Sequence, residues 1–239
     1  MTTPTPPLVL AAHGSPHAAH GPAVLALQQA VAAARPGTSE SVGWLGFDSP
    51  TVGEAAAVAS TQRGGDGWVA VVPLLLTDGY HARYDIPTAL AEVPGAVQQP
   101  VLGPDPLLAD ALLRRLAELD RAYDSVVLAA AGSSDPAARL QCEQAADLLA
   151  LRLGVPVPTG YATGPGPSVV EAIARSRAVR PGGRVVVATY LLGPGTLADR
   201  VAEQARRAGS VASAALGTAP ELVELVVRRW LAPALAPAA

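Results

Sequence analysis

Histidine, the side chain that both ligates first-row metal ions and exchanges protons near neutral pH, is rare and unevenly distributed in this chain. The 239 residues contain four histidines, and three of them, His13, His17 and His20, lie in the short stretch LVLAAHGSPHAAHG. The fourth, His81, follows the apolar segment WVAVVPLLL by a few residues. Imidazoles placed after apolar runs indicate metal binding or proton transfer at the ends of buried strands.

The apolar runs at Leu8–Ala12 and Trp68–Leu76 predict parallel strands that are covered on both faces. Strands that alternate with helices along the chain predict an α/β fold. In such sheets ligands bind beyond the carboxyl ends of the strands, so His13 and His81 are expected to converge over one crevice. We also expect a strand at 42–45 and helices at 22–34, 51–60 and 106–119.

The chain repeats itself. LVLAAHGS at Leu8–Ser15 returns as VVLAAAGS at Val126–Ser133. Three further pairs of matching segments follow in the same order and begin at Ser49 and Gly166, Trp68 and Arg184, and Leu102 and Leu216. We therefore predict two homologous lobes, residues 1–121 and 122–239, each a parallel β-sheet flanked by helices.

The second half of the repeat serves as an internal control for the histidines. Ala131 stands at the place of His13, and Gly195 or Thr196 stands at the place of His81. The Gly-Ser turn is kept, which indicates that it belongs to the fold. A lone histidine at a strand end could simply satisfy backbone carbonyls, but two that are missing together from the second half favour a function of the first half alone.

His17 and His20 lie in an Ala-rich loop and the first turn of a helix. A solvated loop explains both residues. The alternative is an auxiliary role in delivering metal at the mouth of the site.

Composition excludes several classes of function. The net charge is −3 and the sequence has no basic cluster, so it lacks the basic patch that nucleic-acid binding requires. A single cysteine, Cys142, cannot form an internal disulfide and suits a reducing compartment. The chain starts without a basic signal sequence and has no apolar run of about 20 residues, so we expect a cytoplasmic protein without a membrane span.

With AAHGS after the first strand and VVPLLLTDGYHARYDIP after a later one, the chain resembles the class II tetrapyrrole chelatases. It is most similar to the two-repeat form of the sirohydrochlorin cobalto-/ferrochelatases (CbiX-like). The resemblance implies a chelatase-like, flavodoxin-like three-layer α/β/α fold in each lobe. It also implies a monomer in which the second lobe takes the place of a partner subunit.

The resemblance assigns His13 and His81 as the catalytic, metal-holding pair of a lyase-class enzyme. They would hold Fe²⁺, Co²⁺ or Ni²⁺, which is a substrate and not a permanent cofactor, and accept protons from the pyrrole nitrogens. The tetrapyrrole product would enter siroheme or cobalamin biosynthesis. Ser15, Tyr80 and Arg83 are expected to bind the substrate, although Arg83 could instead form a surface ion pair with Asp85.

The sequence departs from the family pattern where the family carries a glutamate before the second helix. Gly46 occupies that position, with Asp48 nearby. Two alternatives follow: Asp48 is an auxiliary metal contact, or the site uses only two protein ligands.

Two other functions remain open on the sequence. One is a carrier that binds a tetrapyrrole or metal without turnover. The other is phosphoryl chemistry at the Gly-Ser turn, which the missing dinucleotide and P-loop fingerprints disfavour.

Overall fold

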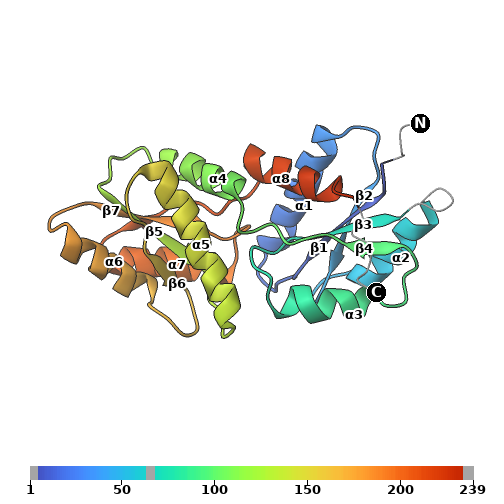
Figure 1. The fold of residues 1–239 in the computed structure, drawn as a ribbon, viewed down its shortest axis with the longest axis horizontal. Coiled ribbons are helices and arrows are strands. Elements are labelled where there is room, and N and C mark those ends of the chain that lie inside the picture. The colour runs from blue at the N-terminus through green and yellow to red at the C-terminus, as the bar shows by residue number, and fades with distance from the viewer. Residues whose placement is uncertain (1–4, 63–67, 234–239) are drawn as a thin grey trace. The chain divides into compact units, whose positions relative to one another are not determined.

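Two parallel sheets organise the chain in the computed structural model, which describes residues 5–62 and 68–233 (Figure 1). The contacts divide the described chain into two units. Unit 1 comprises the residues up to Leu102 together with those from Val223 onward, and unit 2 is Gly103–Leu222. The predicted α/β class with two sheets is confirmed.

The sheet of unit 1 has the strand order β2-β1-β3-β4, and every neighbouring pair is parallel. The predicted first strand has the expected bounds, whereas β2 begins two residues before the predicted one. The strands are β1 (Leu8–Ala12), β2 (Glu40–Trp44), β3 (Val69–Pro73) and β4 (Ala96–Gln98).

Helices cover this sheet because both of its faces are apolar. Val9 and Ala11 of β1 and Val71 of β3 pack against α2 and α3, while their sequence neighbours on the opposite face are equally buried. A strand buried on both faces reads as a continuous apolar run, as the sequence predicted. The helices of this part are α1 (His20–Ala34), α2 (Val52–Gln62), the π-helical turn η1 (His81–Asp85) and α3 (Ile86–Leu90).

Unit 2 repeats this plan, with strand order β6-β5-β7-β8. Its strands are β5 (Ser125–Ala130), β6 (Thr159–Tyr161), β7 (Val185–Tyr190) and β8 (Val211–Ala212). Its helices are α4 (Pro106–Ala117), α5 (Pro136–Leu153), α6 (Val169–Val179) and α7 (Thr196–Arg207).

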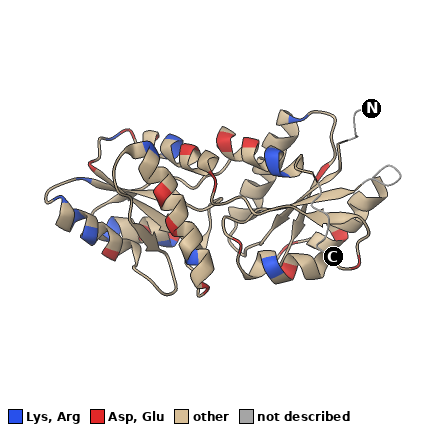
Figure 2. Ribbon diagram, in the orientation of Figure 1, with Lys and Arg blue, Asp and Glu red and all other residues tan. Residues whose placement is uncertain are grey.

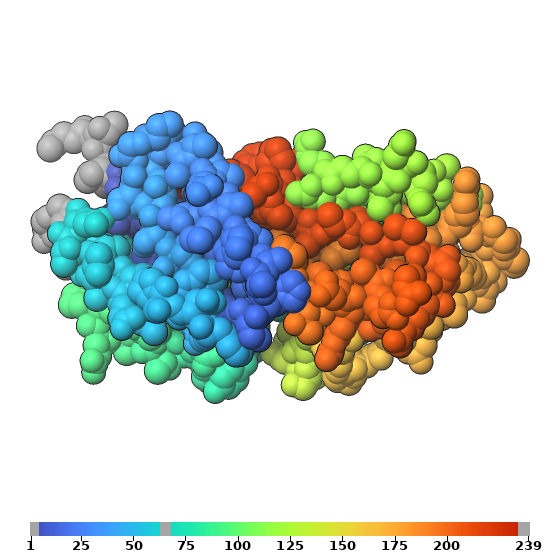
Figure 3. Space-filling view, turned by 180° about the vertical axis from the view of Figure 1, so that it is seen from behind, coloured from blue at the N-terminus to red at the C-terminus, as the bar shows by residue number. Residues whose placement is uncertain are grey.

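The contact units differ from the two repeats of the sequence, because the last helix of each repeat lies wholly or largely in the unit of the other repeat. Helix α4 ends the first repeat but packs against α5 and β7 in unit 2, where Figure 3 shows it in green beside orange segments. Helix α8 (Pro220–Trp230) ends the second repeat and closes unit 1, because buried Trp230 donates its Nε1–H to the carbonyl of Pro6 at 2.9 Å. A sequence repeat identifies homologous segments but not their packing partners.

Charged residues are confined almost entirely to helices and loops (Figure 2). Within the strands as bounded above, Glu40 at the start of β2 is the one charged residue. Among the described residues, none of the helices is both long and apolar enough to cross a membrane.

Candidate active site

Strands β1 and β3 are neighbours at the point where the strand order of unit 1 reverses. In open α/β sheets this switch point, on the carboxyl side of the strands, is where ligands bind. His13 directly follows β1, and His81 begins the helical turn that follows β3. Both histidines therefore lie at the place where this topology forms a site.

The two imidazole rings contact each other. Their centroids lie 4.5 Å apart, and the rings meet edge to face at 76°. His13 is exposed, and the side chain of His81 keeps 42% of its accessible surface. An ion or substrate can reach both rings from solvent.

Both histidines have the same ring nitrogen occupied. His13 Nδ1 lies 2.8 Å from the carbonyl oxygen of Gly14, and His81 Nδ1 lies 2.5 Å from Oδ2 of Asp85. A carbonyl or carboxylate oxygen only accepts hydrogen bonds, so each Nδ1 carries the proton in the neutral ring. The lone pair of each ring is thus on Nε2, ready for a metal ion or a proton.

A glycine with a left-handed backbone holds His13 in place. Gly14 has φ +83°, and a Cβ at this position would lie 1.8 Å from the carbonyl oxygen of Gly46. Gly132 has φ +98°, and its Cβ would lie 1.9 Å from the carbonyl oxygen of Thr163. The close approach of two loops requires glycine in both repeats, as the sequence comparison indicated.

The serine of the turn is also structural in both repeats. The hydroxyl of Ser15 accepts a hydrogen bond from the backbone N–H of His17 at 3.2 Å. Ser133 accepts one from the N–H of Asp135 at 3.1 Å. At the place of His13, Ala131 packs against the core of unit 2. The two repeats share the turn but not the imidazole.

His81 lies on a backbone feature that the second repeat lacks. In η1 the N–H of Ile86 donates to the carbonyl of His81, which is a π-helical bond, whereas the matching segment of unit 2 is the start of the ordinary helix α7. Such turns occur frequently at functional sites. This one places His81 and Asp85 side by side.

Arg83 and Tyr84 of this segment are exposed, whereas Ala82 is buried. Arg83 pairs with Asp78, with 3.1 Å between Nε and Oδ2, and the carboxylate of Asp85 is bonded to His81. The surface ion pair expected as the alternative for Arg83 therefore exists, but with a different partner. Tyr80 is 66% exposed, and its ring centroid lies 6.2 Å from that of His81.

The auxiliary candidates lie around the pair. His17 Nδ1 accepts from the N–H of Ala19 at 3.2 Å, and the ring of His20 lies 6.3 Å from that of Trp44. Asp48 borders the histidine turn, because a Cβ on Gly14 would lie 3.3 Å from its Oδ2. Within residues 5–62 and 68–233, no three His, Cys, Asp or Glu side chains are grouped to hold a metal ion. Metal roles for Asp48, His17 and His20 stay predictions.

Sequence reasoning missed three residues of this region. Asp85 follows His81 by four positions, a spacing that places side chains together on a helical turn and could have identified it. Phe47 lies 6.3 Å from His13 between ring centroids, and Tyr84 lies 5.0 Å from Tyr80. Phe47 is the single phenylalanine of the chain, which was the available signal.

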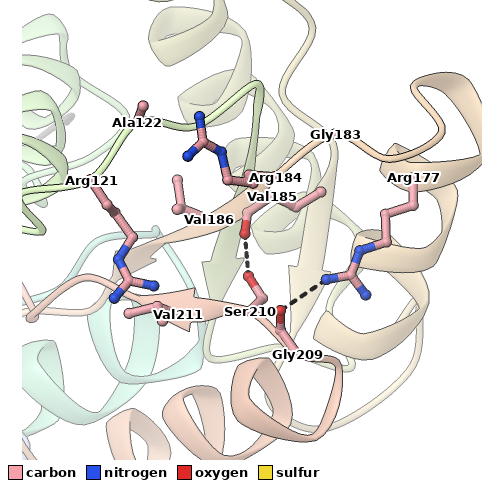
Figure 4. Close-up of a pocket in the computed structure, with 10 residues that line it drawn as sticks. All are labelled: Arg121, Ala122, Arg177, Gly183, Arg184, Val185, Val186, Gly209, Ser210 and Val211. Atoms are coloured by element: carbon pink, nitrogen blue, oxygen red, sulfur yellow. Dashed lines mark hydrogen bonds between the residues drawn. The ribbon is translucent and has the colours of Figure 1, made fainter.

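A cavity of about 330 Å³ in unit 2 lies at the opposite, amino edge of its sheet (Figure 4). It is bordered by Val185 and Val211, the first residues of β7 and β8. The guanidinium of Arg177 donates hydrogen bonds to the carbonyls of Ala208 and Gly209, and the hydroxyl of Ser210 donates one to the carbonyl of Val185. These groups stabilise the loops, so this cavity is not the candidate site.

Comparison with known proteins finds a matching family model and a curated relative. The family model CbiX matches the chain twice, over residues 7–119 and 125–232. A sirohydrochlorin ferrochelatase of Priestia megaterium is 31% identical over 175 residues, which are 69% of this chain and 65% of that relative's length.

Solved structures share the fold. SirB from Bacillus subtilis with Fe³⁺ matches with a TM-score of 0.81 and 23% identity over 94% of each chain. A sirohydrochlorin chelatase SirB from Bacillus subtilis subspecies spizizenii in complex with cobalt matches with a TM-score of 0.76 and 22% identity, over 98% of this chain and 97% of that chain. The family model matches both repeats of the chain, and the protein therefore belongs to the CbiX family.

Proposed function

We propose that this protein is a sirohydrochlorin chelatase, a lyase-class enzyme that inserts Fe²⁺ or Co²⁺ into sirohydrochlorin or a related tetrapyrrole. One observation carries the proposal. Two imidazoles meet at the switch point of the unit 1 sheet, and each has its Nδ1 occupied and its Nε2 lone pair available.

The reaction requires a site that both binds a cation and accepts protons. Inserting a divalent ion into the free-base macrocycle replaces two N–H protons, so one metal ion enters and two protons leave. Neutral imidazole ligates first-row divalent ions and accepts protons near pH 7. Unlike a cluster of carboxylates, it adds no negative charge that would retain the ion.

His13 and His81 would leave coordination positions open. A metal centre with few protein ligands lets a substrate complete the coordination shell, whereas a closed four-ligand site serves structure. In this proposal pyrrole nitrogens replace the remaining ligands and then the imidazoles. Asp48, beside the turn, would contact the ion during delivery, and His17 and His20 would act at the mouth of the site.

The macrocycle carries carboxylates at its rim. Arg83 would bind one of them in bidentate fashion, exchanging its exposed pair with Asp78 for the substrate. An exchange of exposed partners is energetically small, because such surface pairs contribute about 0–1 kcal/mol. Tyr80 would contact the ring system and Ser15 would hold the turn against it.

Iron is the metal that we propose first, with siroheme as the product. The curated relative is named a ferrochelatase, and one similar structure holds Fe³⁺. Cobalt, held by the other similar structure, is the alternative and would direct the product toward cobalamin. The intrinsic affinity of a protein site for these ions rises from iron to cobalt to nickel, so metal supply decides among them.

We also propose a monomeric, cytoplasmic enzyme that uses no permanent cofactor.

An anaerobic absorbance assay tests the proposal. Sirohydrochlorin is mixed with Fe²⁺, Co²⁺ or Ni²⁺, with and without the protein, and the spectrum of the metallated product is followed. We expect catalysed insertion that saturates with sirohydrochlorin. A spectrum that shifts on binding while insertion stays at the uncatalysed rate would reject the enzyme and favour the carrier.

A further inference from the structure

We propose that Phe47 and Tyr84, together with Tyr80, form a platform that binds the flat face of the planar conjugated macrocycle. We call these three residues the aromatic platform. The inference rests on the proposed function for its ligand class, and it assigns Phe47 and Tyr84 as substrate-binding residues that determine specificity.

The platform residues neighbour the histidine pair. The rings of Phe47 and His13 have centroids 6.3 Å apart, and those of His13 and His81 lie 4.5 Å apart. The centroids of His81 and Tyr80 lie 6.2 Å apart, and those of Tyr80 and Tyr84 lie 5.0 Å apart. The five rings form one continuous series with the imidazoles in its interior.

This order matches the geometry of the reaction. A metal ion enters a tetrapyrrole at the centre of the macrocycle, so the residues that hold the ion face that centre. The pyrrole rings then lie over whatever flanks those residues. In this protein the ring of Phe47 neighbours that of His13, and the ring of Tyr80, with Tyr84 beside it, neighbours that of His81. Aromatic rings attract one another in offset or edge-to-face arrangements at centroid distances of about 4.5–7 Å.

Exposure separates these aromatics from the others in the chain. Phe47, Tyr80 and Tyr84 are 71%, 66% and 58% exposed, whereas Trp230 and Tyr190 are fully buried in the core. The protein has one phenylalanine and builds its interior mainly from alanine, valine and leucine. These three rings therefore contribute little to the core, and their exposed faces are free to bind a flat apolar surface.

The backbone presents Phe47 in a fixed position. Its φ of +66° is uncommon for a residue with a side chain, and the N–H of Asp48 closes a tight turn around it by donating to the carbonyl of Gly46 at 2.8 Å. The same loop is anchored to β1 by a bond from the N–H of Leu45 to the carbonyl of Ala12. Strained conformations of this kind persist where the surrounding structure holds them, and they cluster at ligand sites.

The experiment measures binding of metal-free sirohydrochlorin to the full chain by absorbance titration, so that no turnover is needed. The variants that remove a ring are Phe47→Asn, since Asn tolerates a left-handed backbone, and Tyr84→Ala. Phe47→Tyr and Tyr84→Phe keep a ring at each position. Leu151→Ala, which removes a 76% exposed side chain from α5 in unit 2, is the matched control.

We expect the Kd for sirohydrochlorin to rise roughly ten-fold in each variant that loses a ring, from lost stacking and contact area. It should return to within two-fold of the wild type when the ring is kept, and Leu151→Ala should have no effect. Binding of Co²⁺ alone, measured by calorimetry, should be unchanged in Phe47→Asn and Tyr84→Ala because both imidazoles remain.

The outcomes distinguish this inference from the proposed function. Unchanged Kd values in both ring-removing variants, or a wild type that does not bind sirohydrochlorin, would overturn the platform. Catalysed metal insertion with unchanged Kd values would overturn the platform alone. Ring-dependent binding without any insertion would support the platform while rejecting the enzyme.

Discussion

His81 Nδ1 and the Oδ2 atom of Asp85 lie 2.5 Å apart across a π-helical turn. The corresponding acceptor for His13 is an uncharged carbonyl, that of Gly14, at 2.8 Å. A carboxylate that accepts from Nδ1 fixes the orientation of the ring, directs the lone pair to Nε2 and makes that nitrogen a better metal ligand. Asp85 is therefore a positioning residue for His81.

Asp85→Asn should reverse the tautomer of His81. The amide NH₂ group can donate to Nδ1, which favours a ring that carries its proton on Nε2 and cannot ligate there. We expect Co²⁺ affinity to fall roughly 10–100-fold, and less in Asp85→Ala, which imposes neither tautomer. Long-range ¹H–¹⁵N correlation spectra report the tautomer directly. An Nδ1–H signal for His81 that persists in Asp85→Asn would contradict this role.

Gly14→Ala should destabilise the protein more than Gly37→Ala. Both glycines have φ +83°, but a Cβ at Gly37 meets nothing within 4 Å, whereas one at Gly14 would lie 1.8 Å from the carbonyl oxygen of Gly46. The shared backbone strain is about 1–2 kcal/mol, and the clash adds to it for Gly14 alone. Chemical denaturation of both variants gives the comparison. Equal losses of unfolding free energy would show that the two loops can separate freely.

The repeat and the strand pattern together gave most of the scaffold of the site. Apolar runs covered on both faces predicted β1 and β3, and the Gly-Ser turn kept in both halves was correctly assigned to the fold. These signals are local in sequence, because burial on both faces and a close backbone approach each restrict residue type. The convergence of His13 and His81 followed from the rule that ligands bind at carboxyl ends.

Side-chain partners and helix placement could not be predicted in the same way. The link between His81 and Asp85 depends on a π-helical turn, which has no reliable sequence signature. Arg83 pairs with Asp78, and the carboxylate of Asp85 is bonded to His81. The placement of α4 and most of α8 in the other repeat's unit depends on long-range packing. An internal sequence repeat carries no information about such packing.

Trp230→Ala should destabilise unit 1 although it lies at the end of the second repeat. The indole is fully buried and bonded to Pro6 at the start of the chain. Its loss costs about 3–5 kcal/mol, and Leu116→Ala in α4 costs about 2–5 kcal/mol. Hydrogen exchange should quicken in β1 and β3 for Trp230→Ala, and in β5 and β7 for Leu116→Ala. Faster hydrogen exchange in β5 and β7 for Trp230→Ala would contradict the assignment of Trp230 to unit 1.

Cys142 should be inert toward thiol reagents in the native protein. Burial raises the pKa of its thiol to about 11, so the reactive thiolate is scarce at pH 8. In the unfolded chain the thiol pKa is about 8.5. The unfolded state therefore holds fewer protons between these values, and this residue's contribution to stability falls as pH rises through that range. Ellman's reagent at pH 8 should react quickly only after denaturation; rapid native reaction would refute the burial.

The central claim is that His13 and His81 form one metal-holding centre. Its most direct test is the initial rate of metal insertion into sirohydrochlorin, measured anaerobically for His13→Ala, His81→Ala and the double variant. Because groups that act as a unit are not additive, we predict that each single variant falls nearly to the rate of the double variant, which equals the uncatalysed rate. A double variant that inserts metal at the wild-type rate would contradict the account.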